Sequence, residues 1–172
     1  MAATYTAASI NTAFANLKSM MSIFNGSGSG KTLKVYRIWI INSQLTAVTG
    51  VVITLALRRI TACTVGTPIT PVKHDTNSAN LPAQVIVGTN NTDTISAVTY
   101  RLIRRDNDEP AVAGTGTNEL SMLFPMNLIW EAGYYDSNVE PLTLPEGYGI
   151  ALRCETSTVV GSLDVYMEFT AE

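Results

Sequence analysis

The residues that could do chemistry in this chain are few, and a glycine-rich run is the first candidate. Residues 25–32 read N-G-S-G-S-G-K-T, one position short of the phosphate-binding pattern G-x-x-x-x-G-K-[ST], because Asn25 stands where the first glycine belongs. A phosphate-binding loop also opens a helix, whose first backbone N–H groups hold the phosphates. Here Lys31 and Thr32 open the apolar run 33–41 instead. We interpret the glycine-rich run as a flexible turn and expect no nucleotide binding.

Residues for acid–base chemistry and metal binding are equally sparse. His74 is the only histidine, so a Ser-His-Asp arrangement would have to use it, and no G-x-S-x-G or other nucleophile motif accompanies it. Cys63 and Cys154 are too few for a disulfide scaffold or a four-ligand zinc site, and we expect both to be free and buried. In D-N-D-E-P at 106–110, the proline interrupts a calcium-loop pattern. We therefore expect no enzyme, no cofactor and no metal.

A group of aromatic residues lies in the run I-W-E-A-G-Y-Y-D at 129–136. Trp130, Tyr134 and Tyr135 stand there beside Glu131 and Asp136. Such residues can fill a core or form the centre of a protein interface. They also suit a sugar-binding platform, because aromatic faces stack on the C–H faces of sugars while carboxylates bond to the hydroxyl groups. All three interpretations remain open.

Two arginine pairs end predicted strands and are candidates for ion pairs between subunits. Successive side chains of a strand point to opposite faces, so one arginine of each pair is expected in solvent and the other toward a partner or a buried acid. With the aromatic residues and the lone histidine they form our set of candidate interface residues: Trp39, Arg58, Arg59, His74, Arg104, Arg105, Trp130, Tyr134 and Tyr135.

The elements that must position these residues follow a hydrophobic period of two. Polar and apolar residues alternate over 51–58, 98–103, 148–155 and 163–170, which predicts strands with one buried face. The run 33–41 is apolar on both parities and predicts a central strand covered on both faces. Shorter candidates lie at 20–24, 84–87, 120–124 and 128–130. Glycine- and proline-rich turns separate them, so we expect an all-β fold, an antiparallel, jelly-roll-like β-sandwich of eight or nine strands.

The length of 172 residues and the 46% of apolar residues suit one domain over 1–172. Ile10, Phe14, Leu17 and Met21 fall near a helical stripe, so we expect residues 1–24 to form a short N-terminal arm or helix packed on neighbours. The stretch 71–82, P-V-K-H-D-T-N-S-A-N-L-P, is polar and bounded by prolines, and we expect a surface loop.

Charge and hydropathy narrow the classes of partner. No apolar run is long enough to span a membrane and no signal peptide is evident, so we expect a soluble protein. Residues 1–105 hold ten Lys and Arg against two Asp and Glu, net +8, and residues 106–172 hold one Arg against twelve acids, net −11. Either the two parts interleave and their charges cancel locally, or the surface is bipolar and favours association of copies. The total of −3 argues against a nucleic-acid binder.

Two stretches resemble structural proteins of tailed bacteriophages. Residues 22–40, S-I-F-N-G-S-G-S-G-K-T-L-K-V-Y-R-I-W-I, resemble a pattern in which a short strand ends in Asn, a Gly/Ser loop carries S-G-K, and an apolar strand follows. Residues 142–152, L-T-L-P-E-G-Y-G-I-A-L, are similar to the turn before the penultimate strand of many jelly rolls, and V-Y-M-E-F-T at 165–170 fits the final strand.

The resemblance implies a virion jelly-roll protein, assembled in the host cytoplasm, of the head-decoration (cement) kind or a tail component. A decoration protein would self-associate, as a trimer at three-fold positions, and bind the major capsid protein or another virion protein. We expect the N-terminal arm and the loop 71–82 to clamp neighbouring subunits. The alternatives are a receptor- or carbohydrate-binding module using Trp130, Tyr134 and Tyr135, and a jelly-roll enzyme, for which one histidine cannot supply a multi-histidine metal site.

Overall fold

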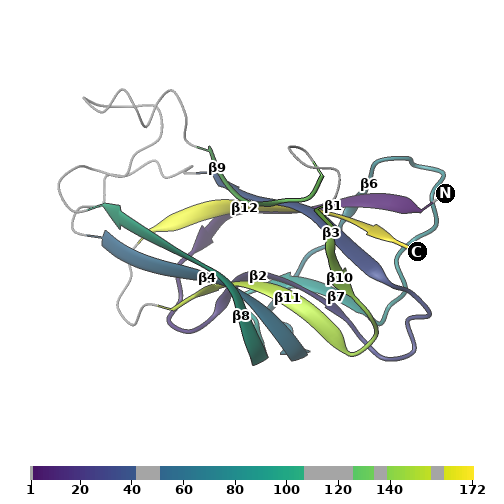
Figure 1. Ribbon diagram of the computed structural model, residues 1–172, viewed down its shortest axis with the longest axis horizontal. Helices are drawn as coiled ribbons and strands as arrows, with labels where there is room; N and C mark the ends of the chain where they lie inside the picture. The colour runs from purple at the N-terminus through teal and green to yellow at the C-terminus, as the bar shows by residue number, and fades with distance from the viewer. Residues whose placement is uncertain (1, 42–50, 107–125, 134–138, 156–160) are drawn as a thin grey trace.

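The computed structural model describes residues 2–41, 51–106, 126–133, 139–155 and 161–172, without the side chains of 51–53, 97–106, 126 and 127 (Figure 1). This part of the chain forms two antiparallel six-stranded sheets that pack face to face, the upper and lower layers of Figure 1. The predicted antiparallel β-sandwich is confirmed. The described strands number twelve rather than eight or nine, because several pair over only two or three residues. No helix in the described ranges is long and apolar enough to cross a membrane.

Sheet A has the strand order β10-β3-β12-β1-β6, with β9 also paired to β3. Its strands are β1 (Ala3–Ala13), β3 (Leu33–Ile41), β6 (Val72–Lys73), β9 (Met126–Glu131), β10 (Leu142–Leu144) and β12 (Ser162–Ala171). Sheet B has the order β5-β7-β2-β11-β4-β8. Its strands are β2 (Ser19–Asn25), β4 (Val51–Thr64), β5 (Thr67–Pro68), β7 (Val85–Thr89), β8 (Thr92–Asp106) and β11 (Tyr148–Cys154).

The core lies between the sheets and follows the predicted alternation most closely in β12. Its inward residues Leu163, Val165, Met167 and Phe169 are buried. Phe169 stacks on Tyr5 of the neighbouring β1, with ring centroids 5.5 Å apart. Strand β12 therefore supplies one continuous stripe of the core from the middle of sheet A.

The prediction that the strand at 33–41 is covered on both faces is wrong. Leu33 and Val35 are buried, and so are Ile38 and Ile40, which stand at the opposite parity in the sequence. The two pairs share one face because the register against β12 shifts at this point, so that Tyr36 is an extra residue between Val35 and Arg37. Such a bulge reverses the parity of the residues that follow it. In the sequence, a strand with one buried face and a bulge therefore has apolar residues at both parities, as a strand with two buried faces would.

The expected N-terminal arm or helix is wrong for the described residues. Residues 3–13 form β1, which lies between β12 and β6 and pairs with β12 from Ala3 to Ala13. The segment between β1 and β2 contains Leu17 with a φ of 54°, which no right-handed helix accommodates. Residues 3–13 therefore form a strand of sheet A and not an arm that extends from the domain. Deleting them would remove a strand that packs in the core.

The predicted surface loop at 71–82 is mostly exposed, but it is tied to β1. Two residues of it form β6, and the backbone N–H of His74 donates to the Thr4 carbonyl at 3.0 Å. The Tyr5 hydroxyl donates to the Ala79 carbonyl at 2.7 Å. The two segments expected to clamp neighbours therefore contact each other.

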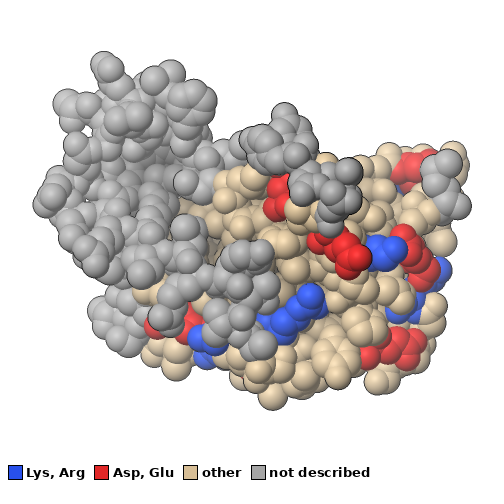
Figure 2. Space-filling view, in the orientation of Figure 1, with Lys and Arg blue, Asp and Glu red and all other residues tan. Residues whose placement is uncertain are grey.

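The opposite charges of the two parts of the chain cancel locally in the described residues. Strand β3 lies between strands from the acidic part, and β11 lies between strands from the basic part. Each described ion pair joins a base from 1–105 to an acid from 106–172: Lys34–Glu172, Arg37–Glu131, Arg37–Glu168 and Arg58–Glu155. Figure 2 shows blue and red side chains interspersed over the described part of the visible face. This arrangement favours interleaving over a bipolar surface.

Truncation of Tyr5 tests whether β1 belongs to the core. Tyr5 is 2% exposed, so Tyr5→Ala should lower the free energy of unfolding by about 3 to 5 kcal/mol, the cost of removing a large aromatic side chain from a core. The measurement is urea denaturation followed by circular dichroism. The matched control is Tyr148→Ala, because Tyr148 is 47% exposed and should change stability by about 0.5 kcal/mol or less. Equal effects of the two changes would contradict the placement of β1.

Candidate functional site

An apolar row crosses the outer face of sheet A. Ala8 lies opposite Tyr166, Tyr166 opposite Trp39, and Trp39 opposite Leu128, so the four residues are in register across β1, β12, β3 and β9. We call these four residues the aromatic row. Leu128 is 49% exposed, and Ile10, two residues after Ala8 on β1, is 63% exposed. Large apolar side chains are thus presented to solvent on a face that alternation would otherwise fill with polar residues.

The centre of the aromatic row is a pair of stacked rings. The rings of Trp39 and Tyr166 are 5.3 Å apart at their centroids, with planes within 7°. Burial raises the pKa of the Tyr166 hydroxyl above its ordinary value, and the charge of Asp164 and a hydrogen bond to it raise that pKa further. The phenol therefore stays neutral. Each ring covers one face of the other, which fixes both side chains in place.

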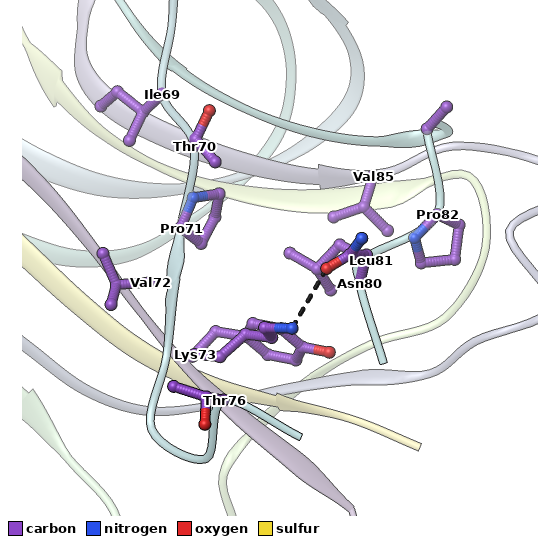
Figure 3. A pocket seen from close by; sticks show the side chains of 12 residues that line it. Ile69, Thr70, Pro71, Val72, Lys73, Thr76, Asn80, Leu81, Pro82 and Val85 are labelled. Carbon is purple, nitrogen blue, oxygen red and sulfur yellow. Dashed lines mark hydrogen bonds between the residues drawn. The ribbon is translucent and has the colours of Figure 1, made fainter. Parts of the chain in front are cut away.

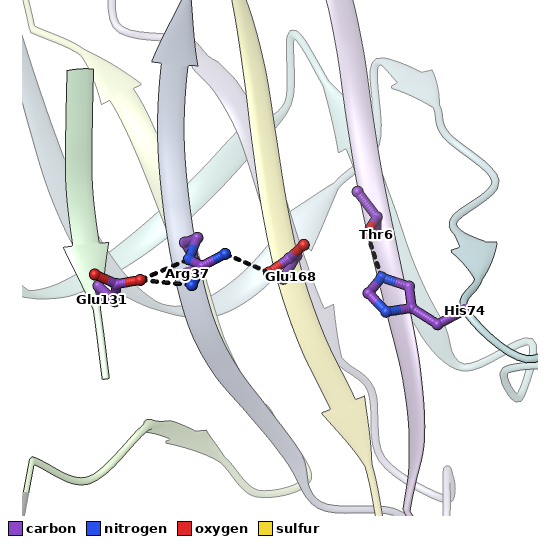
Figure 4. Close-up of polar contacts among 5 residues, drawn as sticks. All are labelled: Thr6, Arg37, His74, Glu131 and Glu168. Atoms are coloured by element: carbon purple, nitrogen blue, oxygen red, sulfur yellow. Dashed lines mark hydrogen bonds and ion pairs between the residues drawn. The ribbon is translucent and has the colours of Figure 1, made fainter. Parts of the chain in front are cut away.

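A charged row runs beside the aromatic row and is ordered by contacts within the chain (Figure 4). Arg37 on β3 lies between Glu131 of β9 and Glu168 of β12. Its Nε donates to Glu131 Oε1 at 2.8 Å, and its Nη1 lies 3.5 Å from Glu168 Oε2. Farther along, Thr6 Oγ1 and His74 Nε2 are 2.7 Å apart and share a hydrogen bond. Arg37 is shared by two carboxylates, so contacts within the chain order this row and offset part of its negative charge.

Together the two rows have the composition of a protein interface. Tryptophan, tyrosine and arginine are the residues enriched at interface centres, and an ordered polar rim is typical around them. Within the described ranges, no three His, Cys, Asp or Glu side chains come together in a way that could hold a metal ion.

The structure places the predicted interface residues in different settings. Trp39 lies in the aromatic row and His74 at the end of the charged row. Arg58 makes a bidentate contact with Glu155, at 2.7 and 2.6 Å, and this hydrogen bonding raises the pKa of the guanidinium. Arg59 Nη1 donates to the Thr143 carbonyl at 2.7 Å. The first arginine pair therefore binds groups of its own chain.

Of the remaining predicted residues, the structure describes the side chain of Trp130 alone. Trp130 is half-buried on β9 and packs against the core. Arg104 and Arg105 lie in β8, but their side chains are outside the described part of the structure, as are Tyr134 and Tyr135 altogether. The proposed cluster of Trp130 with the two tyrosines is therefore neither formed nor excluded, although Trp130 itself contributes to the core.

Sequence reasoning missed Tyr166, Leu128 and Ile10. The signal for Tyr166 was present: it stands between Asp164 and Glu168 at the outward parity of β12, where an aromatic residue marks a contact surface. For Leu128 no such signal exists, because its parity depends on a register shift between β3 and β9.

The glycine-rich run joins β2 to β3 and opens no helix, as predicted. Its backbone N–H groups do bind an anion, but the anion is the chain's own Glu146. Gly28 and Gly30 donate to the Glu146 carboxylate at 3.0 and 2.6 Å, and both glycines have positive φ, 81° and 65°, which lets successive N–H groups converge. These two bonds lower the pKa of Glu146 below its ordinary value of 4.5.

Both cysteines are free, as predicted. Cys154 is fully buried, whereas Cys63 is only half-buried. Burial raises the pKa of the Cys63 thiol to about 12, and the nearby charge of Asp93 adds to the shift. A thiol with this pKa is protonated at neutral pH and is a poor nucleophile.

Comparison with known proteins does not identify a relative. No family model matches the chain, and no similar protein was found among curated proteins or among solved structures.

Replacing Glu146 should make stability less dependent on acid pH. A carboxyl whose folded pKa is lowered contributes stability above its unfolded pKa and loses it as pH falls through the folded pKa. Glu146→Gln should therefore lower the urea midpoint at neutral pH, and the gap to the unmodified protein should close as pH falls below 4.5. Glu140→Gln, a change of an exposed carboxylate on the same segment, is the control. A gap independent of pH would contradict the Glu146 contact.

The cysteines should resist alkylation in the folded protein. At mildly alkaline pH, iodoacetamide should modify Cys63 and Cys154 at least about 100-fold more slowly than in urea, because one thiol has a raised pKa and the other is buried. Intact-protein mass spectrometry follows the added mass. Rapid modification of Cys63 in the native protein would show that its thiol is neither desolvated nor near Asp93.

Proposed function

We propose that this chain is a non-enzymatic virion structural protein of the head-decoration (cement) kind, which self-associates and binds across capsid subunits. The observation that carries the proposal is the aromatic row: apolar side chains in register across four strands of one sheet, with Leu128 and the neighbouring Ile10 exposed. The virion class comes from the resemblance of residues 22–40 and 142–152 to phage structural proteins. The partners are further copies of the chain and the major capsid protein or another virion protein.

The physics of the outer face of sheet A supports association by apolar burial. Covering apolar surface contributes about 25 cal/mol per Å², and rigid aromatic side chains lose little rotamer entropy when they are covered. The neighbouring Glu131 and Glu168 share Arg37 within the chain, which reduces the charge that association has to desolvate. Association through this face should therefore depend weakly on salt.

Trimers at three-fold positions of a capsid assembled in the host cytoplasm are what the resemblance implies. The described residues support an association surface on sheet A, and the three-fold symmetry comes from the resemblance alone. The N-terminal segment contributes to association as strand β1 of this face and not as a free arm, because β1 pairs with β12 and the loop 71–82 bonds to β1.

One alternative is a phage tail component, which would use the same surface. The other alternative is a binding module and not an assembly protein: it would bind a receptor or a carbohydrate. The described residues support the carbohydrate-binding alternative less well. Sugar stacking needs an open aromatic face, whereas Trp39 and Tyr166 each have one face covered by the other and Trp130 packs against the core.

The test changes the row without touching the core. Ile10→Lys combined with Leu128→Lys places one charge in the aromatic row and another beside it. This double change should reduce the copies of the protein bound per particle of the encoding virus at least about tenfold. Quantitative mass spectrometry of purified particles measures occupancy. Tyr148→Lys, on sheet B, is the matched control and should bind normally. Full occupancy by the double variant, or absence of the unmodified protein from particles, would contradict the proposal.

A further inference from the structure

A cavity of about 520 Å³ lies beside β1 and β6, where the segment 69–85 leaves sheet B, crosses to sheet A and returns (Figure 3). The outgoing limb and the returning limb form its walls. Most of the lining is apolar: Ile69, Pro71, Val72, Leu81, Pro82 and Val85. Volumes of about 300 to 1,000 Å³ with such linings are typical of sites for small molecules.

The segment is held open by hydrogen bonds at several points. The Ile69 N–H donates to the Val87 carbonyl at 2.9 Å on the sheet B side. On the sheet A side, Val72 pairs with Thr6, and the Tyr5 hydroxyl donates to Ala79 at the foot of the returning limb. These contacts tie the segment to both sheets, and the cavity is present in the structure without a ligand, which lowers the cost of ordering the segment on binding.

One charged group is built into the cavity. Among the described lining residues, Lys73 alone carries a charge. Its Nζ donates to the Ser78 carbonyl at 2.8 Å and to Asn80 Oδ1 at 3.2 Å, which joins the two limbs. An ammonium group has three N–H donors, and the contacts among described residues use two of them. The neighbouring carboxylate of Asp75 accepts the Asn77 N–H at 2.9 Å, within the turn at the tip.

We propose that this cavity binds a small amphipathic anion, with an alkyl chain on the apolar walls and a carboxylate at Lys73. The apolar lining provides the binding energy by burial, and the third N–H of Lys73 provides the preference for an anion. Val72, which is 70% exposed at the rim, would be covered by the chain of the ligand. This inference is independent of the proposed function, because it uses neither the aromatic row nor a second copy of the protein.

The probes are dodecanoate and dodecyltrimethylammonium, which have the same alkyl chain and opposite charge, below their micelle concentrations. Titration followed by amide chemical shifts should show saturable binding of dodecanoate, with changes confined to residues 69–85 and Tyr5. The cationic probe should bind at least about tenfold more weakly. Equal binding of the two probes, changes that map to the aromatic row, or no saturation by dodecanoate would overturn the proposal.

Two variants keep the test specific. Lys73→Gln can still bond to Ser78 and should weaken dodecanoate about tenfold, while Lys31→Gln, which changes a lysine outside the lining, should not. Ala83→Trp fills the cavity from its rim and should abolish binding without a change in the far-UV spectrum. Repeating the titration on the double variant Ile10→Lys, Leu128→Lys separates this site from the proposed association surface, since its affinity for dodecanoate should be unchanged.

Discussion

The register of β12 between β1 and β3 is the constraint on which the rest of the structure depends. Inward, β12 supplies Leu163, Val165, Met167 and Phe169 to the core; outward, it supplies Tyr166 to the aromatic row and Glu168 to the charged row. Because side chains alternate, a slip of one residue would turn the core stripe to solvent and bury the polar one. The same strand pairing therefore sets both the fold and the candidate interface. The bulge at Tyr36 keeps the buried residues on either side of it, Val35 and Ile38, on the core face of β3.

Interleaving of distant segments has a second consequence, for electrostatics. Strand β3 brings Lys34 and Arg37 from the basic part of the chain between acidic strands, where Glu131, Glu168 and Glu172 pair with them. Surface pairs of this kind contribute little to stability. Their effect is to leave the outer face of sheet A with few unpaired charges, so that the exposed apolar side chains dominate what the face can bind.

The sequence allowed prediction of those elements whose signals are local. The alternation from Leu163 to Thr170 predicted β12 and its buried face, and turn residues predicted the antiparallel sandwich. Bulges were beyond such reasoning, because the parity change at Tyr36 depends on pairing with β12. The helical spacing of Ile10, Phe14, Leu17 and Met21 misled because long-range pairing of β1 outweighs a weak local pattern. The partner of Arg58, Glu155, is distant in the sequence, so no local pattern predicted this pair. The same holds for the cavity beside Lys73, which depends on contacts between the loop 71–82 and β1.

Copies of the chain are proposed to associate through the exposed apolar side chains of the outer face of sheet A, beside charges that pair within the chain. The most direct test is the native mass of the purified protein by size-exclusion chromatography with light scattering, at low and high salt. The account predicts a mass that is a multiple of 18.5 kDa, three copies for a decoration protein, and the same mass at both salt concentrations. A monomer at both concentrations would contradict self-association, and an oligomer that dissociates at high salt would show that unpaired charge holds the copies together.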